Sequence, residues 1–392
     1  ALLTLRGRFL ILKNGSWRKN AAHHPASAGE REVSALHNTA HPAAGPGHPP
    51  ARLPVLDDFN ALCCLLVIMI HVMSLGITDA DPTSWQGAVV FVPWLLSRCA
   101  VPGFLFSGGM KMGLELARDT LSPYGPYILR RAKKVYFPYL FWTLFYYLCF
   151  LPIGYVRGSL AELANYLWFG SLSAQFYYVL VVMQLYLLRP LWRRLVRCVG
   201  WLPGCAGALV VMLAALWLQG AAAQAFPWFA PYQGKLFITY LFYWVAGLYA
   251  GFLRPERLAP TRRLWAILGS GLVVLTYLGL CYLEFSAGVV FFNLELMKPL
   301  SNLLSIYLLM ELCAALKHCG PLLRRFLNWL YQASLFVFFV HCLVLTYATA
   351  ILQKLGVHSL SLLLIGRLVA AYLGSFLLYW LWNRLRQTVR PR

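Results

Sequence analysis

The sequence predicts an all-α fold: a polytopic transmembrane helix bundle with about ten spans and with both termini in the cytoplasm. Three observations support this prediction. Of the 392 residues, 60% are hydrophobic and 12% are charged, which is about half the charged share of a soluble domain. The apolar residues form segments of roughly the length that crosses a bilayer. The basic residues are concentrated in every second loop between these segments.

Residues 1–53 differ in composition from the rest of the chain. The stretch 21–54 is rich in Ala, Pro, Gly and His and has no apolar periodicity, which predicts disorder. The opening segment A-L-L-T-L-R-G-R-F-L-I-L-K is short and basic and lacks a cleavage site after an apolar core, so it is not typical of a signal peptide. We therefore expect a disordered or non-native extension at 1–53, followed by one membrane domain at 54–392.

Ten apolar spans follow this extension. The second span is long and contains Pro93, Pro102 and the pair Gly108 and Gly109, so we expect a kinked or broken helix there. The spans cover approximately residues 57–77, 88–116, 135–153, 174–190, 202–222, 235–253, 263–283, 298–316, 330–352 and 360–383.

The charges of the loops predict the orientation of these spans. The loops after spans two, four, six and eight and the C-terminal tail carry most of the Arg and Lys residues, whereas the alternate loops carry only Arg157 and Lys354. This alternation predicts cytoplasmic termini. It also accounts for the net charge of +21 as a topology signal that meets anionic lipid headgroups. No nucleic-acid partner is therefore predicted.

The ten cysteines do not indicate a disulfide framework or a metal site. Seven of them fall within apolar spans, and none has metal-ligand spacing: Cys63, Cys64, Cys99, Cys149, Cys281, Cys313 and Cys342. Cysteines in such places behave as small hydrophobic residues. We expect no disulfide, no metal and no permanently bound cofactor.

The first span carries the clearest candidate for chemistry. His71 lies deep in an otherwise apolar stretch, where an ionisable side chain costs about 3 kcal/mol on insertion scales and marks a functional site by default. The alternative is a neutral histidine satisfied by a neighbouring hydroxyl or carbonyl. Asn60 precedes His71 by eleven residues, about three helical turns, so both project from nearly one face.

Further ionisable residues lie within other spans. His341 in span nine could converge with His71 on one cavity, or be satisfied separately. Lys111 and Glu115 are four residues apart and are expected to form an ion pair. Arg98 and Arg367 could line a polar cavity or extend to the outer interface.

A basic cluster precedes span three. It contains Arg130, Arg131, Lys133 and Lys134 and is denser than a topology signal requires. Arginine is suited to bidentate binding of phosphate, so Arg130 and Arg131 are candidates for a phosphate-bearing ligand. The alternative is that the cluster only sets the orientation of the span.

Several segments together resemble acyltransferase family 3, membrane proteins that O-acylate bacterial surface glycans. N-A-L-C-C-L-L-V-I-M-I-H at 60–71 is similar to the family's motif of Arg, ten residues and His. The other similar segments are V-P-G-F-L-F-S-G-G at 101–109, R-R-A-K-K-V-Y-F-P-Y at 130–139, Y-Y-V-L-V-V-M-Q-L-Y-L-L-R-P at 177–190 and F-V-F-F-V-H at 336–341. One departure is that Asn60 stands where the motif has Arg, which puts the detail of donor binding in doubt.

This resemblance implies a membrane O-acyltransferase of the bacterial cytoplasmic membrane. Such an enzyme would move an acyl group, acetyl in the first instance, from acetyl-CoA to a hydroxyl of a cell-surface glycan or lipid-linked sugar. His71 would be the general base or the acyl carrier, with neutral imidazole favoured by desolvation. Asn60, Arg130, Arg131 and His341 would bind the donor or support the site.

Two other functions also fit the sequence. A transporter or flippase of glycan-related substrates could use His71 as a proton relay. A membrane sensing module could keep the fold without catalysis, since fold alone does not fix function. The acceptor and the oligomeric state are not specified by the sequence.

Overall fold

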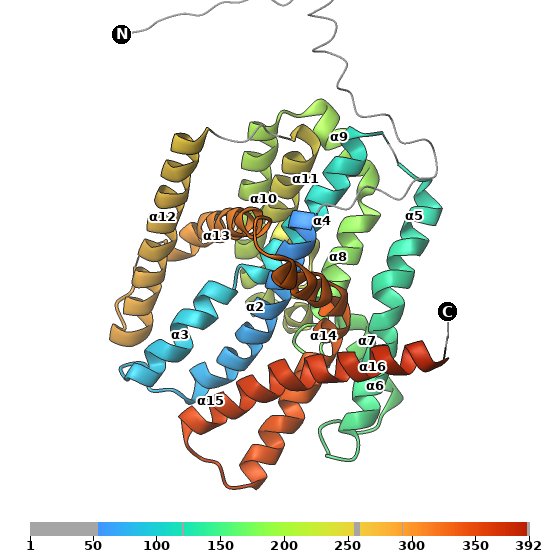
Figure 1. Cartoon of the computed structure of the whole chain (residues 1–392), viewed down its shortest axis with the longest axis vertical. Helices are drawn as coiled ribbons and strands as arrows, with labels where there is room; N and C mark the ends of the chain where they lie inside the picture. Colours follow the sequence, from blue (N-terminus) through green and yellow to red (C-terminus); the bar gives the residue numbers. More distant parts are fainter. Residues whose placement is uncertain (1–53, 120, 255–258, 292, 390–392) are drawn as a thin grey trace, which may run out of the picture. The chain divides into compact units, whose positions relative to one another are not determined.

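The computed structural model describes residues 54–119, 121–254, 259–291 and 293–389. Every regular element within these ranges is helical (Figure 1), which confirms the predicted all-α fold. The predicted extension at 1–53 lies outside the described residues.

Seven helical stretches are long and apolar enough to cross a membrane, judged by length and composition. They are α2 (Pro54–Asp79), α3 with α4 (Trp85–Ala117), α10 (Trp201–Ala225), α12 (Pro260–Ala287), α13 (Leu294–Leu316), α14 (Pro321–Lys354) and α15 with α16 (Leu360–Thr388). The protein is therefore a multi-pass membrane protein. The count of about ten spans and the cytoplasmic position of the termini remain predictions.

Shorter helices complete the described chain. Two of them, α8 and the segment that ends with α11, are apolar but too short to cross a membrane by the same criterion. The shorter helices are α5 (Tyr124–Arg131), η1 (Ala132–Tyr136), α6 (Phe137–Phe150), α7 (Leu160–Phe169), α8 (Tyr177–Leu187), α9 (Arg189–Cys198), η2 (Pro227–Tyr232), η3 (Phe237–Tyr240) and α11 (Leu241–Leu253). The third predicted span is thus the end of a longer stretch in which α5, η1 and α6 follow one another directly.

The second predicted span is broken, as expected. Helix α3 ends at Ser97 and α4 begins at Ala100. Pro102 lies in the first turn of α4, where its missing N–H removes no intrahelical hydrogen bond. The break therefore falls between the two prolines and not at the glycine pair.

The glycines of this span instead allow close helix packing. A Cβ atom on Gly109 or Gly113 would collide with backbone atoms of α11, and one on Gly247 or Gly251 would collide with backbone atoms of α4. Each pair is separated by three residues, so the four glycines let the two backbones touch along one stripe. This contact fixes α4 at the centre of the bundle.

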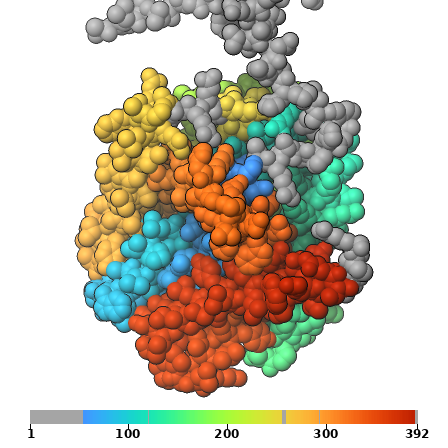
Figure 2. All heavy atoms as spheres, in the orientation of Figure 1, coloured from blue at the N-terminus to red at the C-terminus, as the bar shows by residue number. Residues whose placement is uncertain are grey.

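Central and peripheral helices differ in burial. Half of the apolar window of the α3–α4 stretch is buried, whereas α12 buries 17%. Leucines of α12 such as Leu264, Leu268 and Leu272 are exposed, which is the pattern of a helix that faces lipid. Of the apolar window of α2, 44% is buried, and little of this helix reaches the face shown in Figure 2.

Ion pairs join both ends of α2 to neighbouring helices. Arg324, near the start of α14, pairs with the buried Asp58 at the start of α2, with 2.5 Å between Nη1 and Oδ2. At the other end of α2, the buried Arg367 pairs with Asp79 at 3.3 Å. Arg367 thus lies in protein and does not extend to the interface.

Candidate functional site

His71 lines a small, partly open cavity. Helix α2 is continuous from Pro54 to Asp79, so His71 lies about 25 Å along its axis at 1.5 Å per residue. The cavity has a volume of about 70 Å³ and lies between α2, α4, α8 and α14. Its lining is mostly apolar and aromatic and consists of Val67, Ile70, His71, Val101, Phe104, Gln175, Tyr177, Tyr178 and Phe338.

His341 lies directly beside His71. The centroids of the two imidazole rings are 5.2 Å apart, and the rings are tilted by 41°. His341 is fully buried on α14. The structure therefore brings together two residues that are 270 positions apart in the chain, although His341 is not among the residues that line the cavity.

The two histidines differ in their hydrogen bonding. Nδ1 of His341 is 2.9 Å from the carbonyl oxygen of Val337, and only an N–H can donate to that oxygen. His341 therefore carries its proton on Nδ1 and presents the lone pair of Nε2. Within the described residues, no protein group hydrogen-bonds to the ring of His71. His341 is the satisfied histidine, and His71 is the available one.

Cys342 completes a cluster with these histidines. Its Sγ is 3.3 Å from Nε2 of His341, and the possible ligand atoms of His71, His341 and Cys342 all lie within 4.8 Å of one another. Two histidines and a cysteine are a donor set that suits Zn²⁺, with bonds of about 2.0–2.3 Å. To bind one ion at this distance, the ligand atoms would have to lie closer to one another than 4.8 Å. The lone pair of His71 would then be bound to the metal and could not accept a proton. As they stand, Cys342 and His341 are hydrogen-bonded to each other, and His71 is in ring contact with His341.

Tyr146 of α6 holds the part of α14 that carries the cluster. Its hydroxyl donates to the carbonyl oxygen of Phe339 at 2.7 Å and accepts from the N–H of Leu343 at 2.9 Å. A regular α-helix joins these two backbone groups directly, so Tyr146 inserts into the ladder around His341. Nε2 of Gln175 is a further donor to Tyr146, at 3.2 Å.

Tyrosines form the other polar part of the cavity wall. Tyr177 and Tyr178 begin α8 and line the cavity. The hydroxyls of Tyr177 and Tyr240 are 3.4 Å apart, which extends the polar surface toward α11. These tyrosines, Tyr146 and Gln175 were not predicted, because aromatic residues in apolar spans usually anchor or pack. The pair of tyrosines at 177–178 within the family-like segment was the available signal.

A family model described as an acyltransferase domain matches residues 56–381. The chain belongs to acyltransferase family 3. No curated protein and no solved structure shows a significant match to it. The resemblance found in the sequence is thereby confirmed, and all of its segments lie within the matched residues. The protein is an acyltransferase-family membrane protein.

The family 3 motif at 60–71 lies entirely on α2. Asn60, which replaces the motif's Arg, is buried, and its Nδ2 donates to the carbonyl oxygen of Leu56 at 2.5 Å. Asn60 is not among the residues that line the cavity. Its amide is engaged with its own helix, so a direct contact with a ligand remains a prediction.

Arg130 and Arg131, the two arginines of the family-like basic run, lie in different surroundings. Arg130 is exposed and bonds to the hydroxyl of Ser122. Arg131 is partly buried and pairs with Glu115 at 3.3 Å. The ring of Tyr186 lies 4.8 Å from the Arg131 guanidinium. Neither arginine lines the cavity of His71.

Arg131 also corrects one predicted ion pair. We expected Lys111 to pair with Glu115 on the same helix. Glu115 instead pairs with Arg131 of α5, and Lys111 lies over the ring of Tyr331, with 5.9 Å from Nζ to the centroid. The prediction was wrong because a planar guanidinium from a neighbouring helix reached the carboxylate. Burial raises the pKa of the nearby Tyr127, so its ring remains a neutral partner for Arg131.

Proposed function

We propose that this protein is an O-acyltransferase of the bacterial cytoplasmic membrane. It transfers a short acyl group, acetyl in the first instance, from acyl-CoA to a hydroxyl of a cell-surface glycan or lipid-linked sugar. The observation that supports this proposal best is the position of His71. In a chain of acyltransferase family 3, it is an available imidazole at the wall of a small cavity, beside a second histidine of defined tautomer.

The acceptor hydroxyl gives its proton to a ring nitrogen of His71 as its oxygen attacks the thioester carbon. The new C–O bond forms, the C–S bond breaks, and the proton passes to the departing CoA thiolate. General base catalysis of this kind contributes about 10²–10⁴-fold. His341 holds the ring of His71 from behind and acts as a positioning residue.

The developing oxyanion needs a donor in the same cavity. Tyr178 lines the cavity beside His71, and a phenol hydroxyl is a suitable donor. We assign this role to Tyr178. The cavity is small, about 70 Å³, which favours an acetyl group over a long acyl chain.

Arg130, Arg131 and Asn60 lie toward the start of α2 and the end of α4, at the predicted cytoplasmic side. We propose that the donor approaches from this side and that the glycan acceptor approaches from the outer side. The membrane lipid surrounds the exposed apolar faces of helices such as α12. No bound cofactor is needed for this reaction.

The test uses the full chain purified in nanodiscs. Release of CoA from acetyl-CoA is measured for the wild type, for His71→Ala and for the matched control His358→Ala, which removes an exposed histidine after α14. We expect turnover to fall at least about 100-fold in His71→Ala and to remain in the control. A folded wild type that binds no acetyl-CoA and releases no CoA would overturn the proposal.

A further inference from the structure

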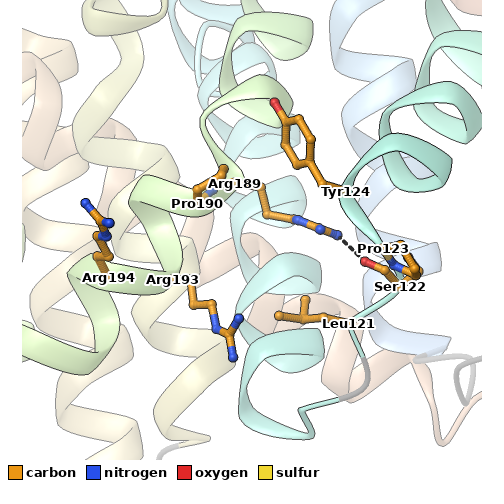
Figure 3. A pocket seen from close by; sticks show the side chains of 8 residues that line it. All are labelled: Leu121, Ser122, Pro123, Tyr124, Arg189, Pro190, Arg193 and Arg194. Atoms are coloured by element: carbon orange, nitrogen blue, oxygen red, sulfur yellow. Dashed lines mark hydrogen bonds between the residues drawn. The ribbon is translucent and has the colours of Figure 1, made fainter.

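A second pocket lies between α9 and the loop that precedes α5. Its volume is about 460 Å³, within the usual range for small-molecule sites. Figure 3 shows the side chains of Arg189 and Arg193 directed from α9 toward this loop, with Tyr124 across from Arg189. We call it the α9 pocket; it is lined by Leu121, Ser122, Pro123, Tyr124, Arg189, Pro190, Arg193 and Arg194.

Arg189 is a buried charge at the wall of this pocket. It is 8% exposed, and its Nη1 donates to the carbonyl oxygen of Ser122 at 2.9 Å. Its guanidinium lies 4.3 Å from the ring centroid of Tyr127 and 5.5 Å from that of Tyr124. Within the described residues, no carboxylate pairs with it. A buried charge without a counter-ion is costly, and a bound anion would remove that cost.

The remaining charges near the pocket are mostly positive. Arg193 is 3.8 Å and Arg197 is 3.2 Å from the same carboxylate, that of Asp119. The side chain of Asp119 is 71% exposed, so these pairs hold the arginines weakly. Among the described residues, no acidic side chain lines the pocket. Arg130 bonds to the hydroxyl of Ser122 at its edge. The site therefore suits a multiply charged anion such as a phosphate ester or a diphosphate.

Helix α8 connects this pocket to the cavity of His71. Tyr178 at the start of α8 lines the cavity, and Arg189 follows the end of the same helix. Arg189 follows Tyr178 by eleven positions, which corresponds to about 17 Å at 1.5 Å per residue. An extended pantetheine arm bridges such a distance between a thioester and a nucleotide. The exposed ring of Tyr124 offers a surface on which a purine can stack.

We propose that the α9 pocket binds the phosphorylated adenosine end of the acyl donor, with Arg189 and Arg193 on its phosphates and Tyr124 against its base. This inference rests on the proposed function. The nucleotide would thus be recognised by residues of the α9 pocket. The basic run at 130–134 lies next to this pocket, through Arg130, but does not line it.

The experiment compares two donors that differ only in the nucleotide. Initial rates are measured with acetyl-CoA and with S-acetylpantetheine for the wild type, Arg193→Gln, Tyr124→Ala and Arg189→Lys. The control Arg262→Gln removes an exposed arginine at the start of α12. We expect KM for acetyl-CoA to rise about 10-fold or more in the pocket variants, with little change in kcat. Their rates with S-acetylpantetheine should equal the wild-type rate.

Several results would overturn the inference while leaving the proposed function intact. One is an unchanged KM for acetyl-CoA in Arg193→Gln and Tyr124→Ala. These two variants keep the buried Arg189, so they test the inference even if Arg189→Lys fails to fold. Another is an equal loss with both donors. A third is a loss of binding to phosphatidylglycerol vesicles, compared with phosphatidylcholine vesicles, without any change in KM, because the ligand would then be a lipid headgroup. Failure of the proposed function is distinct, since the wild type would then use neither donor.

Discussion

The cavity of His71 and the α9 pocket are built in opposite ways. The cavity is small and mostly apolar, and His71 in its wall lies beside His341 from a helix that is far away in the chain. The α9 pocket is larger and basic, and its walls come from one helix and one loop. The cavity offers one available imidazole, whereas the pocket offers several arginines and an exposed aromatic ring.

The difference between the two sites suits the cavity to the chemical step and the α9 pocket to recognition of the donor. A mostly apolar cavity next to a histidine of defined tautomer positions the reacting atoms, while a basic pocket attracts anions from solution. The two sites should therefore affect different kinetic constants. Changes at the cavity should lower kcat, and changes at the α9 pocket should raise KM.

The largest effect is expected for His341→Ala. Removal of this ring takes away the wall that holds His71 and leaves a void in the buried cluster. We expect kcat for acetyl-CoA to fall about 100-fold, within the range of general base effects, with KM unchanged. Steady-state kinetics and a thermal unfolding curve would check this. A change in KM alone would contradict the separation of the two sites.

A smaller effect is expected for the choice of acyl chain. Ile70 lines the cavity, and Ile70→Ala would enlarge it. One methylene in an apolar pocket changes discrimination by about 10–200-fold, so we expect the preference for acetyl-CoA over butyryl-CoA to fall about 10-fold. Competition between the two donors measures this ratio. Leu121→Ala in the α9 pocket is the matched control and should leave the ratio unchanged.

Tyr146→Phe tests the support of the cluster. The hydroxyl satisfies two backbone groups of α14, and loss of a buried partner costs about 1–3 kcal/mol. We expect a lower Tm together with a kcat reduced about 10-fold. Tyr147→Phe, at the next position, is the comparison. Wild-type kcat in Tyr146→Phe would show that this contact is purely structural.

Ionic strength should distinguish the two sites without any substitution. Salt screens exposed charges, with a Debye length of about 10 Å at 0.1 M and about 3 Å at 1 M. We expect KM for acetyl-CoA to rise a few-fold over this range, while KM for S-acetylpantetheine stays constant. Equal salt dependence for both donors would argue against phosphate binding in the α9 pocket.

The smallest effect is expected for chelation. The hydrogen-bonded arrangement of His341 and Cys342 needs no ion, so treatment with EDTA should change the rate by less than about 2-fold. A structural zinc site would behave differently, because removal of the metal would also remove its contribution to folding. Elemental analysis of the purified protein is the direct measurement. One equivalent of zinc would replace the proton-transfer interpretation with a metal centre at His71, His341 and Cys342.

The sequence by itself determined the membrane bundle, the broken second span and the family. Long apolar segments are costly to leave in water and must be helical in lipid, and a proline restricts the backbone wherever it occurs. These effects are local, so they can be recognised from composition and spacing. The depth of His71 is of the same kind, because it depends only on its position in one helix.

Only the tertiary structure decided how side chains on different helices meet. The His71–His341 contact, the insertion of Tyr146 into α14 and the burial of Arg189 all depend on which helix faces lie together. The failed Lys111–Glu115 pair has the same cause, since Arg131 from another helix took the carboxylate. Packing of this kind follows from shape and from close approaches such as the α4–α11 glycine contact, and spacing along one segment does not encode it.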